Sequence, residues 1–424
     1  MIAFMFFGCT NAALAQFGGL GQKFKQKAKE ALDRQTDKTM DKVVGKGENK
    51  VDEKVNEAID GTGKSEKKKS ANAAKENASL NDEKVEAAVF SVNSKFDFIA
   101  GDKVVAVEDF SQDAIGDFPA KWNTNASGEL VSLGFTGNKK WLQFSKNGIY
   151  YPEFIKELPE NFTLTFDMAA TNDMSNSQSG LRVFFPLATS RNLKFDQHFS
   201  YLANSGVDIH PSGDSGSSAA WVVSKEGEKL LENEIEMSWN KNQGNRISIW
   251  RQKSRLRVYV NQTKIWDLPR AFLPETTYSL LFATNLFEGN VYLADLKLAY
   301  GLPDTRNKLI TEGKFSTNGI LFDVNSDVIK AESAGVLKEI AAVLKDNPTV
   351  KVKIIGHTDT DGSADANLKL SKRRALAVKV SLSENYEVDA SRMQSDGVGA
   401  TKPVDNNQTT QGKANNRRVE FVKM

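Results

Sequence analysis

The sequence predicts a multidomain chain in which an all-β sandwich is followed by an α/β domain, a mixed sheet with helices. A charged segment, partly helical and partly disordered, precedes both. Residues 100–302 alternate apolar and polar positions in short runs separated by turn signals, which is typical of antiparallel strands. Residues 312–424 alternate strand-like and helical periodicities, which indicates an α/β domain. Residues 16–99 are dominated by Lys, Asp, Glu, Asn and Ala and hold few apolar side chains for a core.

The composition narrows the classes of function. Lys and Arg total 56 against 54 Asp and Glu, a formal net charge of +2 over 424 residues, so the chain lacks the basic field of a nucleic-acid-binding protein. Cys9 is the single cysteine, which excludes an internal disulfide framework and a cysteine-based zinc site. No apolar run reaches the ~20 residues that a membrane-spanning helix needs. We expect no cofactor and no metal.

Residues 1–15 are interpreted as a signal peptide. Met1 to Phe7 is apolar, and Ala13-Leu14-Ala15 precedes Gln16 as a small-residue cleavage site, although a basic start is missing. A lipoprotein signal with acylation at Cys9 is the alternative, and the preceding phenylalanines fit it poorly. Whether Cys9 is lipidated or removed stays open.

Residues 16–99 are interpreted as a charged helical spacer followed by a disordered linker. Apolar residues recur at intervals of about four positions, or of multiples of four, among charged residues. Such spacing predicts a narrow apolar stripe along one face of a helix. Glycines at 45 and 47 interrupt it, and residues 61–82 have the composition of a disordered linker. A short coiled coil or a helix lying on a membrane surface remains an alternative for the stripe.

Six runs carry the strand pattern of the sandwich most clearly. They are residues 162–168, 180–185, 246–251, 256–260, 278–283 and 289–298. The hairpin over 246–260, followed by Asn261-Gln-Thr-Lys-Ile-Trp-Asp-Leu-Pro269, resembles the concanavalin A-like sandwich in its laminin-G-like form. Asp109-Phe110 and Gly116-Asp-Phe-Pro119 fit the first strand of such domains. The resemblance implies a lectin-like jelly roll that presents a surface to a glycan or to an envelope protein.

Two further features of this region bear on catalysis and sugar binding. Glu232, Glu234 and Glu236 alternate along one predicted strand, as a glycosidase acid group would, but the middle Asp of that pattern is missing. Exposed tryptophans could stack on sugars, the candidates being Trp221, Trp239, Trp250 and Trp266; large aromatics are also the usual core residues of a sandwich.

The C-terminal elements follow in order. We expect strands at 320–322, 350–355, 392–398 and 419–422, and helices at 330–345 and 364–382. The inner face of the first helix should carry Val336, Ile340, Val343 and Leu344, and that of the second Leu368, Ala375, Val378 and Leu382. This order predicts helices packed on one face of a mixed sheet.

One motif spans the second of these strands and the helix after it. Gly356-His-Thr-Asp359 begins at the strand end, and Asn367, Ser371 and Arg374 lie three or four residues apart on one helical stripe. A loop carboxylate facing a helical guanidinium can clamp a zwitterion, the Asp taking the ammonium and the Arg the carboxylate. A structural ion pair between loop and helix is the alternative.

With Gly319–Ser326, Asn407, Gly412 and Asn416-Arg-Arg-Val-Glu-Phe421, this motif resembles the OmpA-like peptidoglycan-binding domain. The resemblance implies that Asp359 and Arg374 bind diaminopimelate of the peptidoglycan stem peptide. It also implies that Asn325, Thr358 and Asn367 line the pocket. His357 is interpreted as packing or bonding within the turn, and Arg417 and Arg418 as bracing nearby carboxylates.

The sequence therefore predicts a non-catalytic cell-envelope protein, in the periplasm or at the periplasmic face of the outer membrane. It would anchor to peptidoglycan and present the sandwich to a glycan or an envelope protein, with outer-membrane association possible. The alternatives are a wall-anchored carbohydrate-active enzyme and an outer-membrane β-barrel with a periplasmic anchor. The sandwich's ligand, the oligomeric state and the role of the charged helix stay open.

Overall fold

The computed structural model describes residues 96–424, except 172–173, 175–178, 190–203, 225–226, 302–304 and 306. The predicted signal peptide and the spacer up to residue 95 lie outside these described residues. Residues 96–99, assigned to the linker from sequence, are described: Phe96 and Phe98 are buried against Trp250 and Tyr259.

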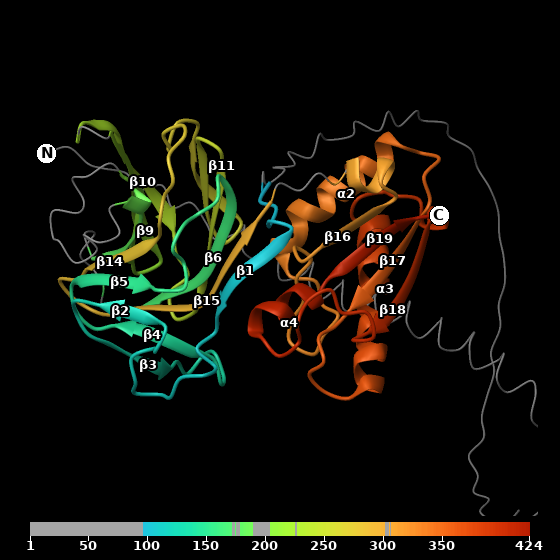
Figure 1. Ribbon diagram of the computed structural model, residues 1–424, viewed down its shortest axis with the longest axis horizontal. Coiled ribbons are helices and arrows are strands. Elements are labelled where there is room, and N and C mark those ends of the chain that lie inside the picture. Colours follow the sequence, from blue (N-terminus) through green and yellow to red (C-terminus); the bar gives the residue numbers. More distant parts are fainter. Residues whose placement is uncertain are drawn as a thin grey trace, which may run out of the picture. The chain divides into compact units, whose positions relative to one another are not determined.

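Two sheets make up the middle of the chain (Figure 1). The first, sheet A, has the order β13-β12-β11-β6-β15-β4-β3, and β1 pairs with β15 beside β4. The second, sheet B, has the order β10-β9-β8-β7-β14-β5-β2. The strands of sheet A are β1 Lys103–Glu108, β3 Gly128–Ser132, β4 Lys140–Phe144, β6 Asn161–Ala170, β11 Asn245–Gln252, β12 Arg255–Val260, β13 Thr263–Leu268 and β15 Val291–Tyr300. Those of sheet B are β2 Trp122–Thr124, β5 Gly148–Pro152, β7 Gly180–Pro186, β8 Asn204–Ser212, β9 Ser215–Val223, β10 Lys229–Ser238 and β14 Leu281–Asn285.

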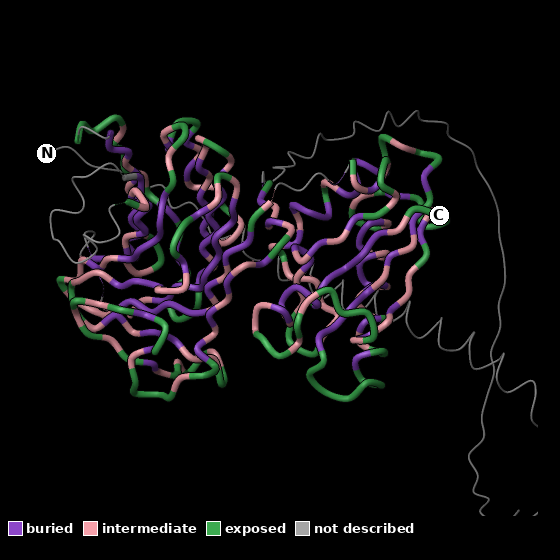
Figure 2. Tube along the Cα trace, viewed as in Figure 1, coloured by how far each residue is buried: buried purple, intermediate pink, exposed green. Residues whose placement is uncertain are grey.

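One hydrophobic core is shared by the two sheets. Leu164, Phe166 and Met168 of β6 and Val183 and Phe185 of β7 are fully buried in the same cluster. These residues alternate along their strands, as expected when each sheet turns one face inward. Figure 2 shows the buried stretches concentrated in strands and the exposed stretches in loops. The alternating runs seen in the sequence are therefore the strands of a two-sheet sandwich.

The C-terminal domain is a four-stranded mixed sheet with helices. Its strand order is β16-β19-β17-β18; β17 and β18 are parallel and the other pairs antiparallel. The elements are η3 Asn307–Thr311, β16 Lys314–Thr317, η4 Ala331–Ser333, α2 Ala334–Asp346, β17 Val352–His357, α3 Ala364–Glu384, η5 Ala390–Arg392, β18 Met393–Gly399, α4 Thr410–Asn416 and β19 Val419–Lys423. Buried residues of α2 and α3 share one cluster with Val352 and Ile354, so both helices cover the same face of the sheet.

Two expectations for this domain were wrong. The predicted strand at 320–322 is not a strand: Ile320 is buried in the core and Phe322 makes one isolated bridge to Ile329, while the first strand is β16. A short apolar run does not distinguish a buried loop from a strand. Leu368, expected on the inner face of α3, is 38% exposed. Among the described helices, none is long and apolar enough to cross a membrane.

The edge of β1 is covered by a side chain from the C-terminal domain. Asn415 of α4 accepts a hydrogen bond from the Val104 N–H and donates one to the Val104 carbonyl, each at 3.0 Å. The amide thus satisfies both groups as a neighbouring strand would. Close to the start of α2, Gly335 lies against the Phe98 carbonyl, and a Cβ there would come within 2.1 Å of that oxygen.

Helix α3 lies very close to the strands it covers. A Cβ at Gly356 of β17 would lie 2.2 Å from the Ser371 carbonyl oxygen, and one at Gly397 of β18 would lie 2.2 Å from the Lys372 nitrogen. The buried Ser371 hydroxyl accepts a hydrogen bond from the Gly399 N–H at 2.9 Å. The two glycines therefore set the distance between helix and sheet.

Gly356→Ala is expected to lower the free energy of unfolding by about 3 kcal/mol or more, because the new methyl group collides with backbone of α3. Gly134→Ala is the control, since a Cβ there meets nothing within 4 Å, and its effect should stay within about 0.5 kcal/mol. Thermal and chemical unfolding of both variants measure the difference. Equal stability of the two would contradict the packing described.

Candidate functional site

Asp359 is held in place at the start of the loop between β17 and α3. The preceding Thr358 donates its N–H to the Gly399 carbonyl at 3.0 Å, which fixes the chain as it leaves the sheet. The Asp359 side chain is 10% exposed, and its Oδ1 accepts the Asp361 N–H at 3.1 Å. Its Oδ2 is bound by Nη1 of Arg417, which lies just before β19.

Asn367 shapes the same loop from the first turns of α3. Its Nδ2 donates to the carbonyls of Asp359 at 3.3 Å and Asp361 at 2.9 Å. Ser363 caps the helix, its hydroxyl accepting the Ala366 N–H at 3.3 Å. Since Asn367 is buried and its amide serves the backbone, it positions the loop that carries the carboxylate.

Arg374 reaches from α3 to the loop between β16 and η4. Its Nε donates to the Ser326 carbonyl at 2.9 Å and its Nη2 to the Asp323 carbonyl at 3.3 Å. The guanidinium lies 4.8 Å from the centre of the Phe322 ring, an arrangement that favours a cation. The loop thus fixes the plane of the guanidinium.

The electrostatics of the site favour an anion beside Arg374. Burial lowers the pKa of Arg374, nearby Arg417 lowers it further, and Asp359 opposes the shift. No ion pair joins Asp359 to Arg374 among the described residues; Asp359 pairs with Arg417 instead. The carboxylate of Asp359 thus neutralises Arg417 directly and acts on Arg374 only from a distance.

The site residues predicted from the sequence lie on two loops and on α3, and they differ in their exposure to solvent. Thr358 and Asp359 share one loop that Asn367 holds, and Arg374 binds the loop that contains Asn325. Asn325 is exposed, with a left-handed φ of 54°. Thr358 is 4% exposed, and its Oγ1 has no hydrogen-bond partner in the described part of the chain.

Arg417 is the residue that sequence reasoning assigned only a bracing role. It does brace a carboxylate, and that carboxylate belongs to Asp359 at the candidate site. Its side chain is 45% exposed, so it is accessible from solvent. The pairing of β19 with β17 sets Val419 opposite Gly356 and so brings Arg417 to the end of β17, a contact between distant segments that no local pattern indicates.

His357 forms a buried pair with a carboxylate. Its Nε2 lies 2.9 Å from Oε2 of Glu420, while its Nδ1 has no hydrogen-bond partner in the described residues. Burial, aided by Arg418, lowers the pKa of His357 to about 4 although Glu420 opposes the shift. The described residues contain no group of three or more His, Cys, Asp or Glu side chains that could hold a metal ion.

The candidate sugar-binding and catalytic residues of the sandwich differ in their exposure to solvent. Trp239, Trp250 and Trp266 are buried core residues, whereas Trp221 on β9 is partly exposed. Glu232, Glu234 and Glu236 are exposed on the edge strand β10, where Glu232 pairs with Lys229 at 2.7 Å. The aromatic sugar platform proposed from sequence is thereby reduced to Trp221.

His357 should make the protein acid-sensitive. An unfolded histidine titrates near pH 6.5, so the unfolded chain takes up a proton between about pH 6.5 and 4 that the folded chain does not. The associated stability is complete above that window and is lost as the pH falls through it, by about 2 kcal/mol between pH 7 and 5. Chemical unfolding at both pH values should show a smaller loss for His357→Gln than for wild type. Identical losses would contradict the lowered pKa.

Comparison with known proteins gives a family for the C-terminal domain. Residues 321–417 match the model of the OmpA family. The probable lipoprotein YiaD of Escherichia coli (strain K12) is 43% identical over 105 residues, which are 25% of this chain and 48% of that protein. The chain thus spans about half the length of that relative.

Two solved structures are similar to parts of this chain. The peptidoglycan-associated lipoprotein from Burkholderia pseudomallei is 31% identical, with a TM-score of 0.24, over 26% of this chain and 89% of that one. The carbohydrate recognition domain of Emp47p is 11% identical, with a TM-score of 0.35, over 47% of this chain and 98% of that one. The second likeness does not establish the concanavalin A-like resemblance of the sandwich. Residues 321–417 of this chain form an OmpA family domain.

Proposed function

We propose that the C-terminal domain anchors this protein to peptidoglycan in the cell envelope by holding the free zwitterionic end of diaminopimelate. Asp359 accepts the ammonium, and Arg374 binds the carboxylate. The observation that carries the proposal is that both groups are fixed by neighbours and not by each other. The OmpA family match and the likeness to a lipoprotein named for its association with peptidoglycan support it.

Arg374 has donors to spare for a carboxylate. Its contacts to Ser326 and Asp323 use Nε and one hydrogen of Nη2. A guanidinium carries five N–H groups, so both hydrogens on Nη1 and one on Nη2 remain. Paired donation from the two terminal nitrogens matches the geometry of a carboxylate.

Asp359 likewise retains acceptor capacity. The Asp361 N–H and Arg417 occupy one position on each oxygen. A carboxylate offers about four lone-pair positions, so an incoming ammonium finds room. Because the side chain is nearly buried, that ammonium would be held where water screens the attraction weakly.

The sandwich has one surface that suits a polar ligand. On the outer face of sheet B, Arg182 pairs with Asp208 at 3.0 Å, and Nε2 of His210 lies 3.5 Å from Asp208. Asp208 and His210 are 5% and 7% exposed, yet Oδ1 of Asp208 and Nδ1 of His210 have no hydrogen-bond partner in the described residues. Arg182, whose side chain is 38% exposed, is the member of this cluster that a glycan or an envelope protein would contact.

Asp359→Ala and Arg374→Ala are each expected to weaken binding to diaminopimelate-type peptidoglycan by roughly 30-fold or more, about 2 kcal/mol, because each leaves one ligand charge unpaired. Both variants should keep a normal thermal unfolding transition. Co-sedimentation of the protein with purified sacculi, over a series of peptidoglycan concentrations, measures the affinity.

Arg373→Ala is the matched control. Arg373 is adjacent in sequence and also on α3, but its Nε lies 3.6 Å from Oδ1 of Asp327, and it forms no ion pair with Asp359 in the described part of the chain. Its variant should bind like wild type. If Arg374→Ala also binds like wild type while remaining folded, the proposed clamp is wrong.

A further inference from the structure

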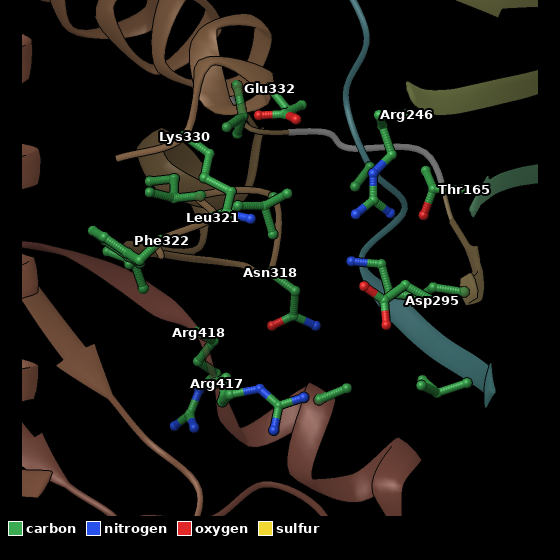
Figure 3. A pocket seen from close by; sticks show the side chains of 18 of the residues that line it. Thr165, Arg246, Asp295, Asn318, Leu321, Phe322, Lys330, Glu332, Arg417 and Arg418 are labelled. Carbon is green, nitrogen blue, oxygen red and sulfur yellow. The ribbon is translucent and has the colours of Figure 1, made fainter. Parts of the chain in front are cut away.

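A cavity of about 350 Å³ lies between the outer face of sheet A and the C-terminal domain. Its size is at the lower end of the usual range for small-molecule sites. Figure 3 shows Thr165, Arg246 and Asp295 of the sandwich facing Asn318 and Arg417 of the C-terminal domain across it. The cavity therefore has walls from both folded regions.

The sandwich wall is one row of residues that crosses four strands. Ser248 of β11 pairs with Thr165 of β6, Thr165 pairs with Lys297 of β15, and Lys297 pairs with Val107 of β1. All four residues line the cavity. Since residues in register on neighbouring strands point to the same face, the sheet presents a continuous wall.

Two polar groups in this row are not satisfied by the protein. Thr165 is 7% exposed, and its Oγ1 has no hydrogen-bond partner in the described residues. The Lys297 ammonium forms no ion pair or hydrogen bond within the same part of the chain, whereas neighbouring Arg246 pairs with Asp167 at 2.8 Å. Burial beside Arg246 and Arg417 lowers the pKa of Lys297 to about 8, so it remains mainly protonated at neutral pH. An unpaired ammonium in such a place is costly unless a ligand neutralises it.

The opposite wall contains residues of the proposed diaminopimelate site. Arg374 and Arg417 both line the cavity. The cationic side chains around it are Arg246, Lys297, Lys330, Arg374, Arg417 and Arg418, and the carboxylates are Asp109, Asp295 and Glu332. Asp295 is already paired with Lys139 at 2.5 Å. Arg246, Lys330, Arg417 and Arg418 are also paired with carboxylates. Lys297 and Arg374 form no ion pair among the described residues, and these two cations favour an anionic occupant next to the clamped amino-acid end.

We infer that the sandwich completes the peptidoglycan site: Lys297 and Thr165 bind a second carboxylate of the same peptide whose diaminopimelate is held by Asp359 and Arg374. This rests on the proposed function. The α-carboxylate of the γ-linked D-glutamate that precedes diaminopimelate has the required charge and is one residue away. Lys297 supplies the counterion, and the Thr165 hydroxyl donates a hydrogen bond.

The test compares two synthetic tripeptides, L-Ala-γ-D-Glu-meso-diaminopimelate and the same peptide with its glutamate α-carboxylate amidated. Isothermal titration calorimetry on the full protein at one fixed ionic strength gives both dissociation constants. Wild type should bind the amidated peptide about tenfold more weakly. Lys297→Met should lose about tenfold toward the acidic peptide and show no preference between the two, which a double-mutant cycle expresses as coupling.

Two further variants show whether the change in affinity is specific to the cavity. Thr165→Val, which keeps the shape of the side chain, should weaken binding of the acidic peptide by a smaller factor. Lys241→Met is the matched control, because Lys241 is exposed, pairs with Asp214 and does not line the cavity. It should bind both peptides like wild type. Lys297→Met should unfold at the same temperature as wild type or higher, since it removes an unpaired partly buried charge.

The outcomes separate this inference from the proposed function. If wild type binds both peptides equally, or Lys297→Met retains the full preference for the acidic peptide, the second carboxylate site is wrong and the clamp stands. If wild type binds neither peptide, the clamp itself is wrong and the inference is lost with it.

Discussion

The close approach of α3 to β17 and β18 is the constraint on which the site depends. Gly356 and Gly397 leave no space for a side chain between the helix and the sheet, and Ser371 bonds across the gap. With the helix at this distance, the loop that carries Asp359 is short enough for Asn367 to hold its carbonyls. Arg374, about two turns further along α3 than Asn367, then reaches the loop after β16. Packing at one point thus fixes two charged groups of opposite sign.

Backbone groups and the Arg417 side chain position the two charged groups around this packing. Arg374 is oriented by carbonyls, Asp359 by a backbone N–H and by Arg417, and neither depends on the other. This arrangement allows a ligand to enter without first breaking a bond between Asp359 and Arg374. A side chain also satisfies backbone groups at the edge of β1. There the Asn415 amide bonds the backbone of β1 as a neighbouring strand would, and it joins α4 to sheet A. That junction brings Lys297 and Thr165 to the side of the cavity opposite Arg374.

Local patterns were sufficient for much of the fold and for the elements that carry the candidate site residues. Alternation located the strands that became β6, β7, β11 and β12, and the spacing of Asp359 and Arg374 placed them around one loop and one helix. Contacts between segments that are far apart in the chain could not be predicted from local sequence patterns. Arg417 reaches Asp359 only because β19 pairs with β17, and the core position of Trp250 depends on Phe98 folding back onto it. The run at 320–322 was misassigned because burial of Ile320 in a loop gives the same apolar signal as a strand.

A crystal structure of the protein with meso-diaminopimelate bound would show whether Asp359 and Arg374 clamp the ligand. One amino-acid end of the ligand is expected in the site, with its ammonium within hydrogen-bond distance of Asp359 and its carboxylate on the terminal nitrogens of Arg374. A ligand bound with the reverse orientation, or bound elsewhere while Asp359 and Arg374 keep their present contacts, would show that the clamp is wrong.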